Sequence, residues 1–353
     1  MRRWPRPRPE PAYPGLLMRI SLPSRLGFGT APLGNMYRDI PHEEALATVD
    51  AAWDSGIRYF DAAPLYGAGL AELRLGEALA GRPRDAYSLG TKVGRLVLDE
   101  HEDASQRDLG EKGGLFRHGL PNRIVYDYTE DGTLRSIDAS LERLRTDRLD
   151  TVWIHDPAVD FHGDAWHDVF DIAMSGAARA LTRLRDEKVI QGWGLGVNRV
   201  EPCELALERA DPDGFLLAGR YTLLDHAGAL ERLMPESAAR GLGIIVGGPY
   251  NSGVLAGGTH YEYQPATQAM LDRVARIRRI CERFGVDVRA VALQFSLAHP
   301  AVAAAIPGAS RPDRIDDNLR LAAASIPAEL WDTLKAERLI AALAPTPVGP
   351  DRG

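Results

Sequence analysis

Three short apolar runs of the sequence each end on a polar residue that is able to take part in acid–base chemistry. Asp61 ends the run "GIRYFD", Lys92 ends "AYSLGTK" and His155 ends "LDTVWIH", and Tyr66 follows shortly after Asp61. An ammonium at the end of a buried strand is costly unless an opposite charge lies close to it. Asp61 supplies that charge, because a pair about 4 Å apart at an effective dielectric near 20 interacts by about 4 kcal/mol.

A phenol beside a lysine indicates proton transfer. A cation next to Tyr66 stabilises the phenolate, so we expect the pKa of Tyr66 to fall from about 10 toward neutrality. The hydroxyl then becomes a usable general acid or base, and His155 holds the substrate oxygen. The structural alternative is an ion pair between Lys92 and Asp61 with a capping histidine nearby and no part in catalysis.

The elements that must position these residues alternate along the chain. Short apolar runs are separated by segments of helical period, such as 131–147, 226–240 and 267–298. The strand-like runs are LGFGTA, GIRYFD, AYSLGTK, LDTVWIH, GWGLGV, FLLAGR, LGIIVGG and VAAAIPG. These eight βα units without a linker favour an α/β fold, a (β/α)8 TIM barrel in a single domain over residues 18–345, rather than a doubly wound sheet with a second domain. In such a barrel, the carboxyl ends of the strands share one mouth.

Two connections are too long for simple turns. The polar, glycine-rich segment from Arg95 to Tyr128 follows the third strand, and residues 251–265 follow the seventh. Both belong on the face where the strands end. We predict long loops there, the first of them acting as a partial lid over the site.

Composition limits the classes of function. The chain has 353 residues, a formal net charge of -7 and no apolar run of membrane-spanning length, which argues against nucleic-acid and membrane partners. Two cysteines, Cys203 and Cys281, lie far apart without metal-type spacing, and this favours a reducing cytoplasm. We expect a small-molecule substrate and a monomer or small homo-oligomer.

The first residues of the sequence differ from the rest. Residues 1–17 are rich in Arg and Pro and cannot form a packed element, so we predict a disordered tail there. Arg2 and Arg3 resemble a twin-arginine export signal, but no apolar region or cleavage site follows them. The folded body then begins near Met18, which is an alternative start to Met1.

A cluster of histidines and aspartates supports a rival interpretation. The stretch "FHGDAWHD" places His162, Asp164, His167 and Asp168 close together, as in a metal-dependent hydrolase of the TIM-barrel class. However, the histidines are not spaced i, i+4, and Asp164 is a suitable helix N-cap. We therefore predict no metal site.

Four blocks of the sequence together resemble the aldo-keto reductases. They are FDAAPLYGAGLAELRLGEAL, GTKVG, DTVWIHD and IPGASRPDRIDDNL, in that order between Leu26 and Leu321. The resemblance implies a (β/α)8 barrel that transfers hydride between a nicotinamide cofactor, NAD or NADP, and a carbonyl or alcohol. It also implies that Tyr66 is the general acid/base, that Lys92 and Asp61 tune it, and that His155 orients the substrate.

The phosphates of such a cofactor should bind late in the barrel. The glycines of "GFGTAPLG" do not form a dinucleotide fingerprint, because Pro32 intervenes and no helix opens directly after them. By contrast, "IPGASRPDRIDDN" leaves the last strand and begins a helix near Ser310, where exposed N–H groups attract anions and Arg311 adds positive charge. An ordinary capped surface helix is the alternative. By the resemblance, Arg314 reads the adenosine end, and Asp317 and Asn318 lie near the adenine.

Several positions depart from the common pattern of the family. Gly308 stands where many members have a lysine, which weakens a clamp for the 2′-phosphate and favours NAD or dual use. Val197 replaces a serine before Asn198, an expected ligand of the nicotinamide amide, and Ala218 replaces a glutamine. Gly247 replaces the tyrosine that stacks on the ring. The expected cofactor residues near the ring are therefore Asn198, Gly248, Tyr250 and Tyr221.

These departures, with "GGPYNSGVL", resemble one branch of the family, which contains aldose (L-fucose or D-threo-aldose type) 1-dehydrogenases and pyridoxal dehydrogenases. Members of that branch oxidise a cyclic hemiacetal to a lactone. We therefore expect oxidation of an aldose at C1. The alternatives are a pyridoxal 4-dehydrogenase, a general NADPH-dependent aldehyde or ketone reductase, and a cofactor-binding regulatory subunit like the potassium-channel partners of the family.

Overall fold

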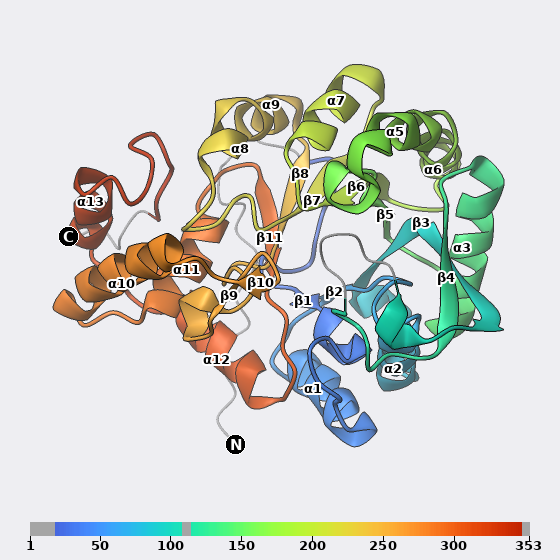
Figure 1. Cartoon of the computed structure of the whole chain (residues 1–353), viewed down its shortest axis with the longest axis horizontal. Helices are drawn as coiled ribbons and strands as arrows, with labels where there is room; N and C mark the ends of the chain where they lie inside the picture. The colour runs from blue at the N-terminus through green and yellow to red at the C-terminus, as the bar shows by residue number, and fades with distance from the viewer. Residues whose placement is uncertain (1–17, 108–113, 348–353) are drawn as a thin grey trace.

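The computed structural model describes residues 18–107 and 114–347, and the predicted tail over residues 1–17 lies outside this range. Eight strands form one parallel sheet in chain order (Figure 1). They are β1 Phe28–Gly29, β2 Tyr59–Asp61, β3 Ser88–His101, β5 Thr151–His155, β6 Gly192–Val197, β7 Gly214–Ala218, β8 Gly243–Gly247 and β11 Val302–Ile306. Each of the eight predicted strand-like runs overlaps one of them, so this prediction is confirmed.

The sheet closes on itself into a barrel. Parallel bridges pair Leu26 with Ala305 and Gly29 with Gly308, which joins the first strand to the last. The register pairs Asp61 with Gly90 and His155 with Gly196, and each of the two residues ends its strand at the carboxyl edge of the parallel sheet. The predicted (β/α)8 barrel is confirmed.

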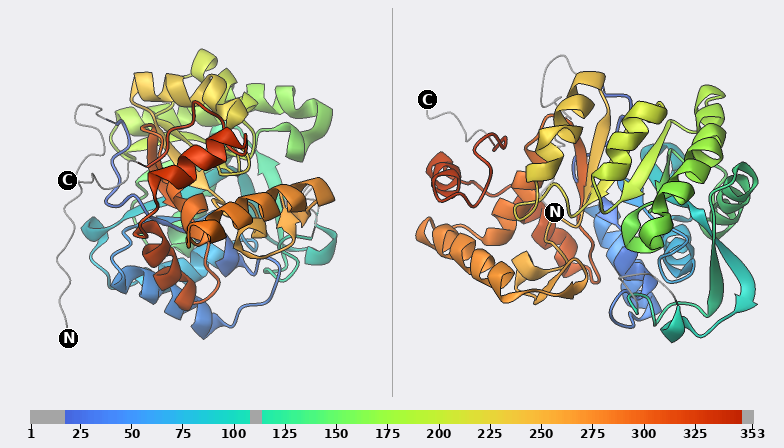
Figure 2. Two further views of the ribbon diagram at one scale, coloured as in Figure 1. Left: turned by 90° about the vertical axis from the view of Figure 1, so that its left-hand side faces the viewer. Right: turned by 45° about the horizontal axis from the view of Figure 1, so that its top comes forward.

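Helices cover the outside of the barrel (Figure 2). They are α1 His42–Asp54, α2 Leu70–Leu79, α3 Glu130–Arg143, α4 Val159–His162, α5 Trp166–Ser175, α6 Ala177–Asp186, α7 Glu201–Arg209, α8 Ala227–Glu231, α9 Leu233–Arg240, α10 Gln268–Arg283, α11 Val288–Leu297, α12 Asp313–Ala322 and α13 Ala328–Ala336. The expected helical stretch 267–298 is two helices, because Gly285 has φ +67° and ends the first of them. Asp287 caps the second through the backbone N–H of Arg289.

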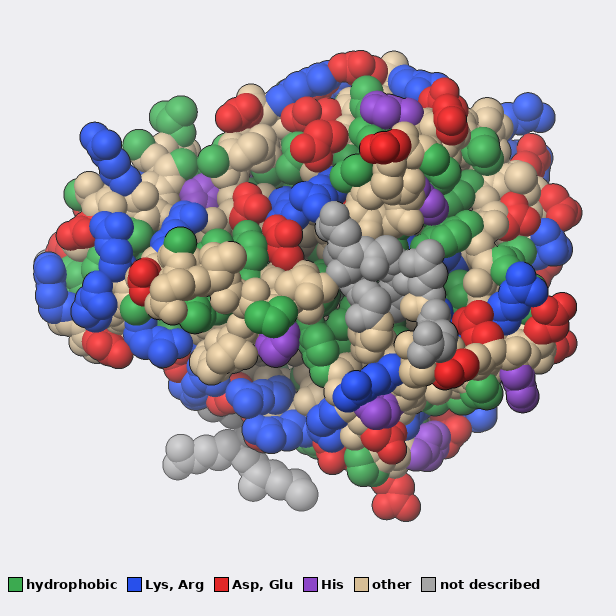
Figure 3. All heavy atoms as spheres, viewed as in Figure 1, with side chains coloured by type: hydrophobic (Ala, Val, Ile, Leu, Met, Phe, Trp, Pro, Cys, Tyr) green, Lys and Arg blue, Asp and Glu red, His purple; other side chains and the backbone are tan. Residues whose placement is uncertain are grey.

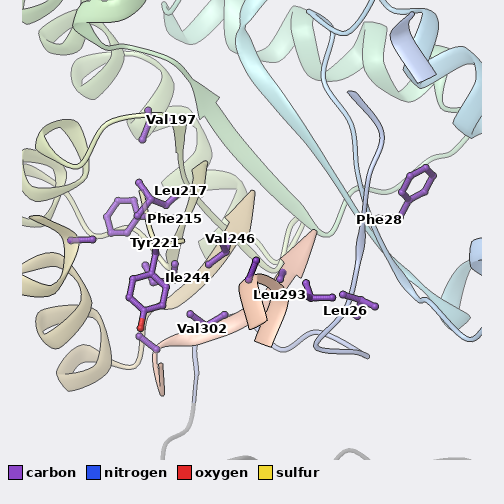
Figure 4. Close-up of a cluster of buried hydrophobic side chains, with 14 of the residues drawn as sticks. Leu26, Phe28, Val197, Phe215, Leu217, Tyr221, Ile244, Val246, Leu293 and Val302 are labelled. Carbon is purple, nitrogen blue, oxygen red and sulfur yellow. The ribbon is translucent and has the colours of Figure 1, made fainter. Parts of the chain in front are cut away.

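Alternation along the strands divides the apolar residues into two layers. The larger layer lies between the strands and the helices; Phe28, Phe215, Leu217 and Val246 are among its members (Figure 4). The smaller cluster fills the barrel interior and comprises Ile20, Tyr59, Trp153, Leu216, Ile245, Ala304 and Ile306. Because this plug packs the interior below the strand ends, the polar residues there face the mouth of a filled barrel.

The segment from Arg95 to Tyr128 is not a loop throughout, which corrects the prediction. β3 continues to His101 and pairs antiparallel with β4 Asn122–Asp127, so the two form a hairpin that projects beyond the barrel (Figure 1). The alternating polar and apolar residues of β4 stabilise a two-stranded ribbon with one face toward solvent. In the second long connection, β9 His260–Tyr261 pairs with β10 Gln264–Pro265.

Charged side chains of both signs are interspersed over the face shown in Figure 3. Within the described parts of the chain, the helices are all too short or too polar to cross a membrane.

Candidate active site

A buried ion pair lies at the carboxyl ends of β2 and β3. Lys92 Nζ lies 2.5 Å from Asp61 Oδ2 and donates to the carbonyl of Ala62 at 2.8 Å. Both side chains are 1% exposed. The pairing follows from the register, since Asp61 lies opposite Gly90 and Lys92 comes two residues later on the same face of β3. The predicted contact between Asp61 and Lys92 is confirmed.

Tyr66 lies beside this ion pair on the turn after β2. The turn is tight: the N–H of Tyr66 donates to Ala63 O at 3.1 Å, and Gly67 follows with φ +67°. Lys92 Nζ lies 4.7 Å from the centroid of the half-buried Tyr66 ring. The structure therefore brings together the phenol, the ammonium and the carboxylate.

The expected fall in the pKa of Tyr66 is wrong for the protein alone. Burial raises the pKa well above its ordinary value, and the nearby carboxylates of Asp61 and Asp156 raise it further. Lys92 does not reverse this shift because its charge is directly paired with Asp61. Tyr66 is thus held as a neutral phenol that is able to donate a proton.

His155 completes the predicted group of four. Its ring meets that of Tyr66 edge-on, with centroids 5.9 Å apart, and its side chain is 8% exposed. Nε2 of His155 lies 3.3 Å from Oδ2 of Asp156, the next residue along the chain. Tyr128 fixes the backbone here, because its hydroxyl donates to His155 O at 2.7 Å.

A cavity of about 780 Å³ is lined by Asp61 and Tyr66, whereas Lys92 and His155 are not part of its lining. It extends from Asp61 and Tyr66 to the start of α12, across the ends of several strands. Most of the residues expected to bind the cofactor line it, namely Asn198, Gly248, Tyr250, Gly308, Ser310, Arg314, Asp317 and Asn318. Tyr250 donates its hydroxyl hydrogen to Asn318 Oδ1 at 2.7 Å, which ties the wall after β8 to α12.

Two expected cofactor residues lie elsewhere. Tyr221 is fully buried in the layer between strands and helices, stacked on Phe295 with centroids 5.6 Å apart (Figure 4). Gly219, with φ +74°, turns the chain after β7, and Tyr221 then enters the core instead of the cavity. Arg311 is exposed and pairs with Asp313 at 2.8 Å, outside the lining of the cavity. Both positions correct the prediction.

The comparison with known proteins agrees with this geometry. Residues 25–337 match the Aldo/keto reductase family. The chain belongs to this family.

Relatives resemble this aldo-keto reductase over most of their length. Pyridoxal 4-dehydrogenase of Microbacterium luteolum is 40% identical, over 89% of this chain and 94% of that protein. D-threo-aldose 1-dehydrogenase of a Pseudomonas species is 39% identical, over 93% and 96%. Among solved structures, the holo form of an aldo-keto reductase from Bacillus halodurans has a TM-score of 0.68 at 25% identity, covering 95% of this chain and 97% of that one.

The far end of the cavity fits the nucleotide that the family implies. Gly219, Gly247, Gly248 and Gly253 are part of its lining, and because they lack side chains they let a ligand approach the backbone closely. The beginning of α12 with Arg314, and the turn before it with Ser310, are also part of the lining. These residues would hold a dinucleotide of this aldo-keto reductase with its reactive end toward Tyr66.

The sequence analysis missed several residues at the substrate end. Phe116 stacks near Tyr66 with ring centroids 5.6 Å apart, and Tyr263 donates to Asn198 Oδ1 at 3.3 Å. Asp160 is 2% exposed and lines the cavity. Asp156 was also missed. Its position directly after His155 could have indicated a role at the site, but the burial of its side chain depends on backbone geometry that the sequence does not show.

The histidine and aspartate cluster that suggested a metal site is dispersed. His162 contacts the Tyr128 hydroxyl at 3.1 Å, and burial lowers its pKa to about 4. Asp164, His167 and Asp168 are exposed. Over residues 18–107 and 114–347, no group of three or more His, Cys, Asp or Glu side chains is placed to hold a metal ion.

Proposed function

We propose that this aldo-keto reductase oxidises a cyclic hemiacetal at the anomeric carbon of an aldose, giving a lactone, with NAD or NADP as hydride acceptor. The observation that carries the proposal is the buried ion pair of Asp61 and Lys92 beside Tyr66 at the floor of the cavity. The relative named D-threo-aldose 1-dehydrogenase, which is 39% identical, supports the substrate class.

Tyr66 and His155 have different roles toward the substrate: Tyr66 transfers the proton and His155 orients the oxygen. In oxidation, the phenolate form of Tyr66 accepts the proton of the anomeric hydroxyl at Oη, while His155 orients the same oxygen. The bound nicotinamide supplies the hydride acceptor. Lys92 holds positive charge beside the ring, and Asp61 is its buried partner in an ion pair. In the reverse direction, Tyr66 returns the proton to a carbonyl oxygen.

Polar side chains near the mouth suit a sugar. Asp160 and Arg199 line the cavity, and both carry groups that bind hydroxyls. Tyr263 adds an aromatic surface beside them, and the apolar face of a sugar ring packs on such surfaces. We infer that a hydroxyl-rich substrate is bound here and is positioned by several hydrogen bonds.

The charges at the adenosine end favour NAD over NADP. Asp317 Oδ1 lies 3.0 Å from Arg320, and its Oδ2 lies 3.3 Å from Arg289 and 3.9 Å from Arg314. The carboxylate of Asp317 offsets one of these three guanidinium charges and repels a 2′-phosphate, whereas it accepts a hydrogen bond from a 2′-hydroxyl. Gly308 supplies no cation of its own. We propose NAD as the preferred cofactor, with NADP used more weakly.

Pyridoxal is the second candidate substrate, because the relative named pyridoxal 4-dehydrogenase is 40% identical to this chain. Pyridoxal also forms a cyclic hemiacetal, so the same proton transfer by Tyr66 applies to it. The aromatic rings of Tyr37, Tyr66 and Tyr263 line the cavity and would pack against a pyridine ring.

The test is turnover on a panel of aldoses, pyridoxal and simple aldehydes, each with NAD and NADP. We expect oxidation of an aldose such as L-fucose, with kcat/KM at least about tenfold higher for NAD than for NADP. Oxidation of pyridoxal alone would select the second candidate. Reduction of simple aldehydes by NADPH without oxidation of any hemiacetal would overturn both candidates, and binding of nucleotide without any turnover would favour a regulatory subunit.

We propose that the enzyme acts in the cytoplasm on small molecules alone, as a monomer or small homo-oligomer. Cys203 and Cys281 support a reducing location, since both are buried free thiols.

A further inference from the structure

Asp156 has an unusual backbone conformation for a buried side chain. It follows β5 directly with φ +53°, a region that residues other than glycine seldom adopt, and its side chain is 3% exposed. The backbone N–H of Asp156 donates to Gly196 O on β6 at 3.0 Å. The left-handed residue is therefore still hydrogen-bonded to the neighbouring strand of the sheet. Strained backbone of this kind concentrates at functional sites.

The carboxylate of Asp156 contacts three side chains, from within β3, from the end of β5 and from the residue after β6. Arg95 Nη2 lies 3.1 Å from Oδ2, and His155 Nε2 lies 3.3 Å from the same oxygen. On the other side, Asn198 Nδ2 donates to Oδ1 at 3.2 Å. The group therefore links the residue expected to orient the substrate with the residue expected to hold the nicotinamide amide.

Hydrogen-bond chemistry assigns the orientation of Asn198. A carboxylate only accepts hydrogen bonds, so the amide NH2 of Asn198 must face Asp156. Its Oδ1 then accepts the hydroxyl hydrogen of Tyr263 at 3.3 Å. Without a carboxylate at position 156, this hydrogen bond would no longer fix the orientation of the Asn198 side-chain amide.

Arg95 offsets the charge of Asp156 and is itself held in place. Its side chain is 1% exposed, and its guanidinium carbon lies 5.1 Å from the Tyr126 ring centroid and 4.7 Å from that of Phe161. Nη1 donates to His155 O at 3.4 Å. A buried carboxylate with this partner is held in one position, which a solvent-exposed ion pair would not ensure.

We propose that Asp156 is a positioning residue that sets His155 and Asn198 together, so that substrate orientation and cofactor binding depend on one carboxylate. Arg95 serves as its buried counter-ion. This inference rests on the proposed function for the roles of His155 and Asn198. Asp156 itself acts through these two residues and is not a catalytic residue.

The test compares Asp156→Asn with Asp150→Asn. Asp150 is a matched control, because it precedes β5 at the opposite end of the barrel, is 4% exposed and pairs with Arg84 at 2.6 Å. In Asp156→Asn the amide turns a donor toward Arg95 or Asn198, so we expect the dissociation constant for NAD to rise and kcat to fall, each by about tenfold. In Asp150→Asn we expect loss of thermal stability with both constants within about twofold of wild type.

A second variant separates positioning from folding. Asp156→Asn combined with Arg95→Gln removes both buried charges, so neither is left without its partner. We expect this double variant to fold and to keep the defects in NAD binding and kcat. Equal defects in Asp150→Asn would overturn the proposal, as would a folded double variant with wild-type constants. NAD binding is measured without substrate, by calorimetry, so it tests Asp156 even if no aldose is oxidised.

Discussion

At the scale of single residues, the contact between Lys92 and Asp61 determines the electrostatics of the site. Each charge is buried to 1% exposure, and each would be unstable there without the other. The ammonium lies near the face of Tyr66, 4.7 Å from the ring centroid, while Asp61 raises the pKa of the phenol. The pair therefore keeps a cation beside the phenol without making the resting phenol acidic.

Replacing the lysine tests this dependence. In Lys92→Met, Asp61 is left buried without its cation, so we expect stability to fall by about 3 kcal/mol and turnover to be lost. Unfolding in urea and steady-state kinetics measure the two effects. Adding Asp61→Asn should restore much of the stability but none of the turnover. If the double variant regained turnover, the ion pair would have only a structural role.

The direction of the Tyr66 pKa shift predicts how rate depends on pH. Oxidation requires the phenolate to accept a proton, and burial with Asp61 and Asp156 raises the pKa of Tyr66. Below that pKa the phenolate fraction increases about tenfold per pH unit, so kcat/KM for oxidation should still be rising above pH 9. Reduction uses the neutral phenol and should not require alkaline pH. A plateau in oxidation below about pH 8 would contradict this shift.

At the scale of elements, the hairpin of β3 and β4 supports the site from one side. The connection between its strands contributes Phe116, which is 2% exposed and clusters with Leu65 against the Tyr66 ring. The hairpin thus does more than extend the barrel, since it holds the phenol in place.

Truncating this contact should impair catalysis more than stability. We expect Phe116→Ala to lower kcat/KM by about tenfold, because the Tyr66 ring loses the surface that orients it. Arg123→Ala on β4 is the control, as its side chain is 51% exposed and forms a surface ion pair with Glu100 at 2.9 Å. Kinetics within about twofold of wild type for Phe116→Ala would show that the hairpin does not position Tyr66.

At the scale of the whole molecule, close approach of neighbouring strands shapes the barrel. A Cβ at Gly194 on β6 would lie 1.8 Å from Gly214 O on β7, and backbone cannot yield there without moving a strand. At Gly228 on α8, an added Cβ meets nothing within 4 Å. The two glycines therefore differ in what they contribute to the fold.

These positions predict opposite changes in stability. Gly194→Ala should lower the free energy of unfolding by about 3 kcal/mol, because the barrel must open to admit the methyl group. Gly228→Ala should raise it by about 0.5–1 kcal/mol through better helix propensity. Unfolding in urea checks both values. An unchanged urea midpoint of unfolding for Gly194→Ala would contradict this prediction, because it would mean that β6 and β7 separate to admit the methyl group at little cost.

The sequence predicted the barrel and the four residues at the mouth because both follow from local patterns. Apolar strands ending on Asp61, Lys92 and His155 are visible without structure, and the barrel rule places their ends together. Two of the misses depend on single backbone torsions. Gly219 directs Tyr221 into the core, and the φ of Asp156 turns its carboxylate inward. Neither angle is readable from residue type.

The expected pKa of Tyr66 was wrong for a different reason. Burial and the two carboxylates around the ring depend on packing between distant segments, such as Asp156 after β5 and Tyr66 after β2. The sequence indicated the cation at Lys92, but not how completely Asp61 pairs with it. Long-range electrostatics of this kind requires coordinates.

The most direct measurement is turnover and NAD binding in Tyr66→Phe. This change removes one hydroxyl and leaves the ring, its contact with Phe116 and the pair of Lys92 and Asp61 in place. We predict that kcat falls by about 1,000-fold, the scale of general acid–base catalysis, while the dissociation constant for NAD stays within about twofold of wild type. Turnover within about tenfold of wild type would contradict the role of Tyr66 and, with it, the proposed chemistry.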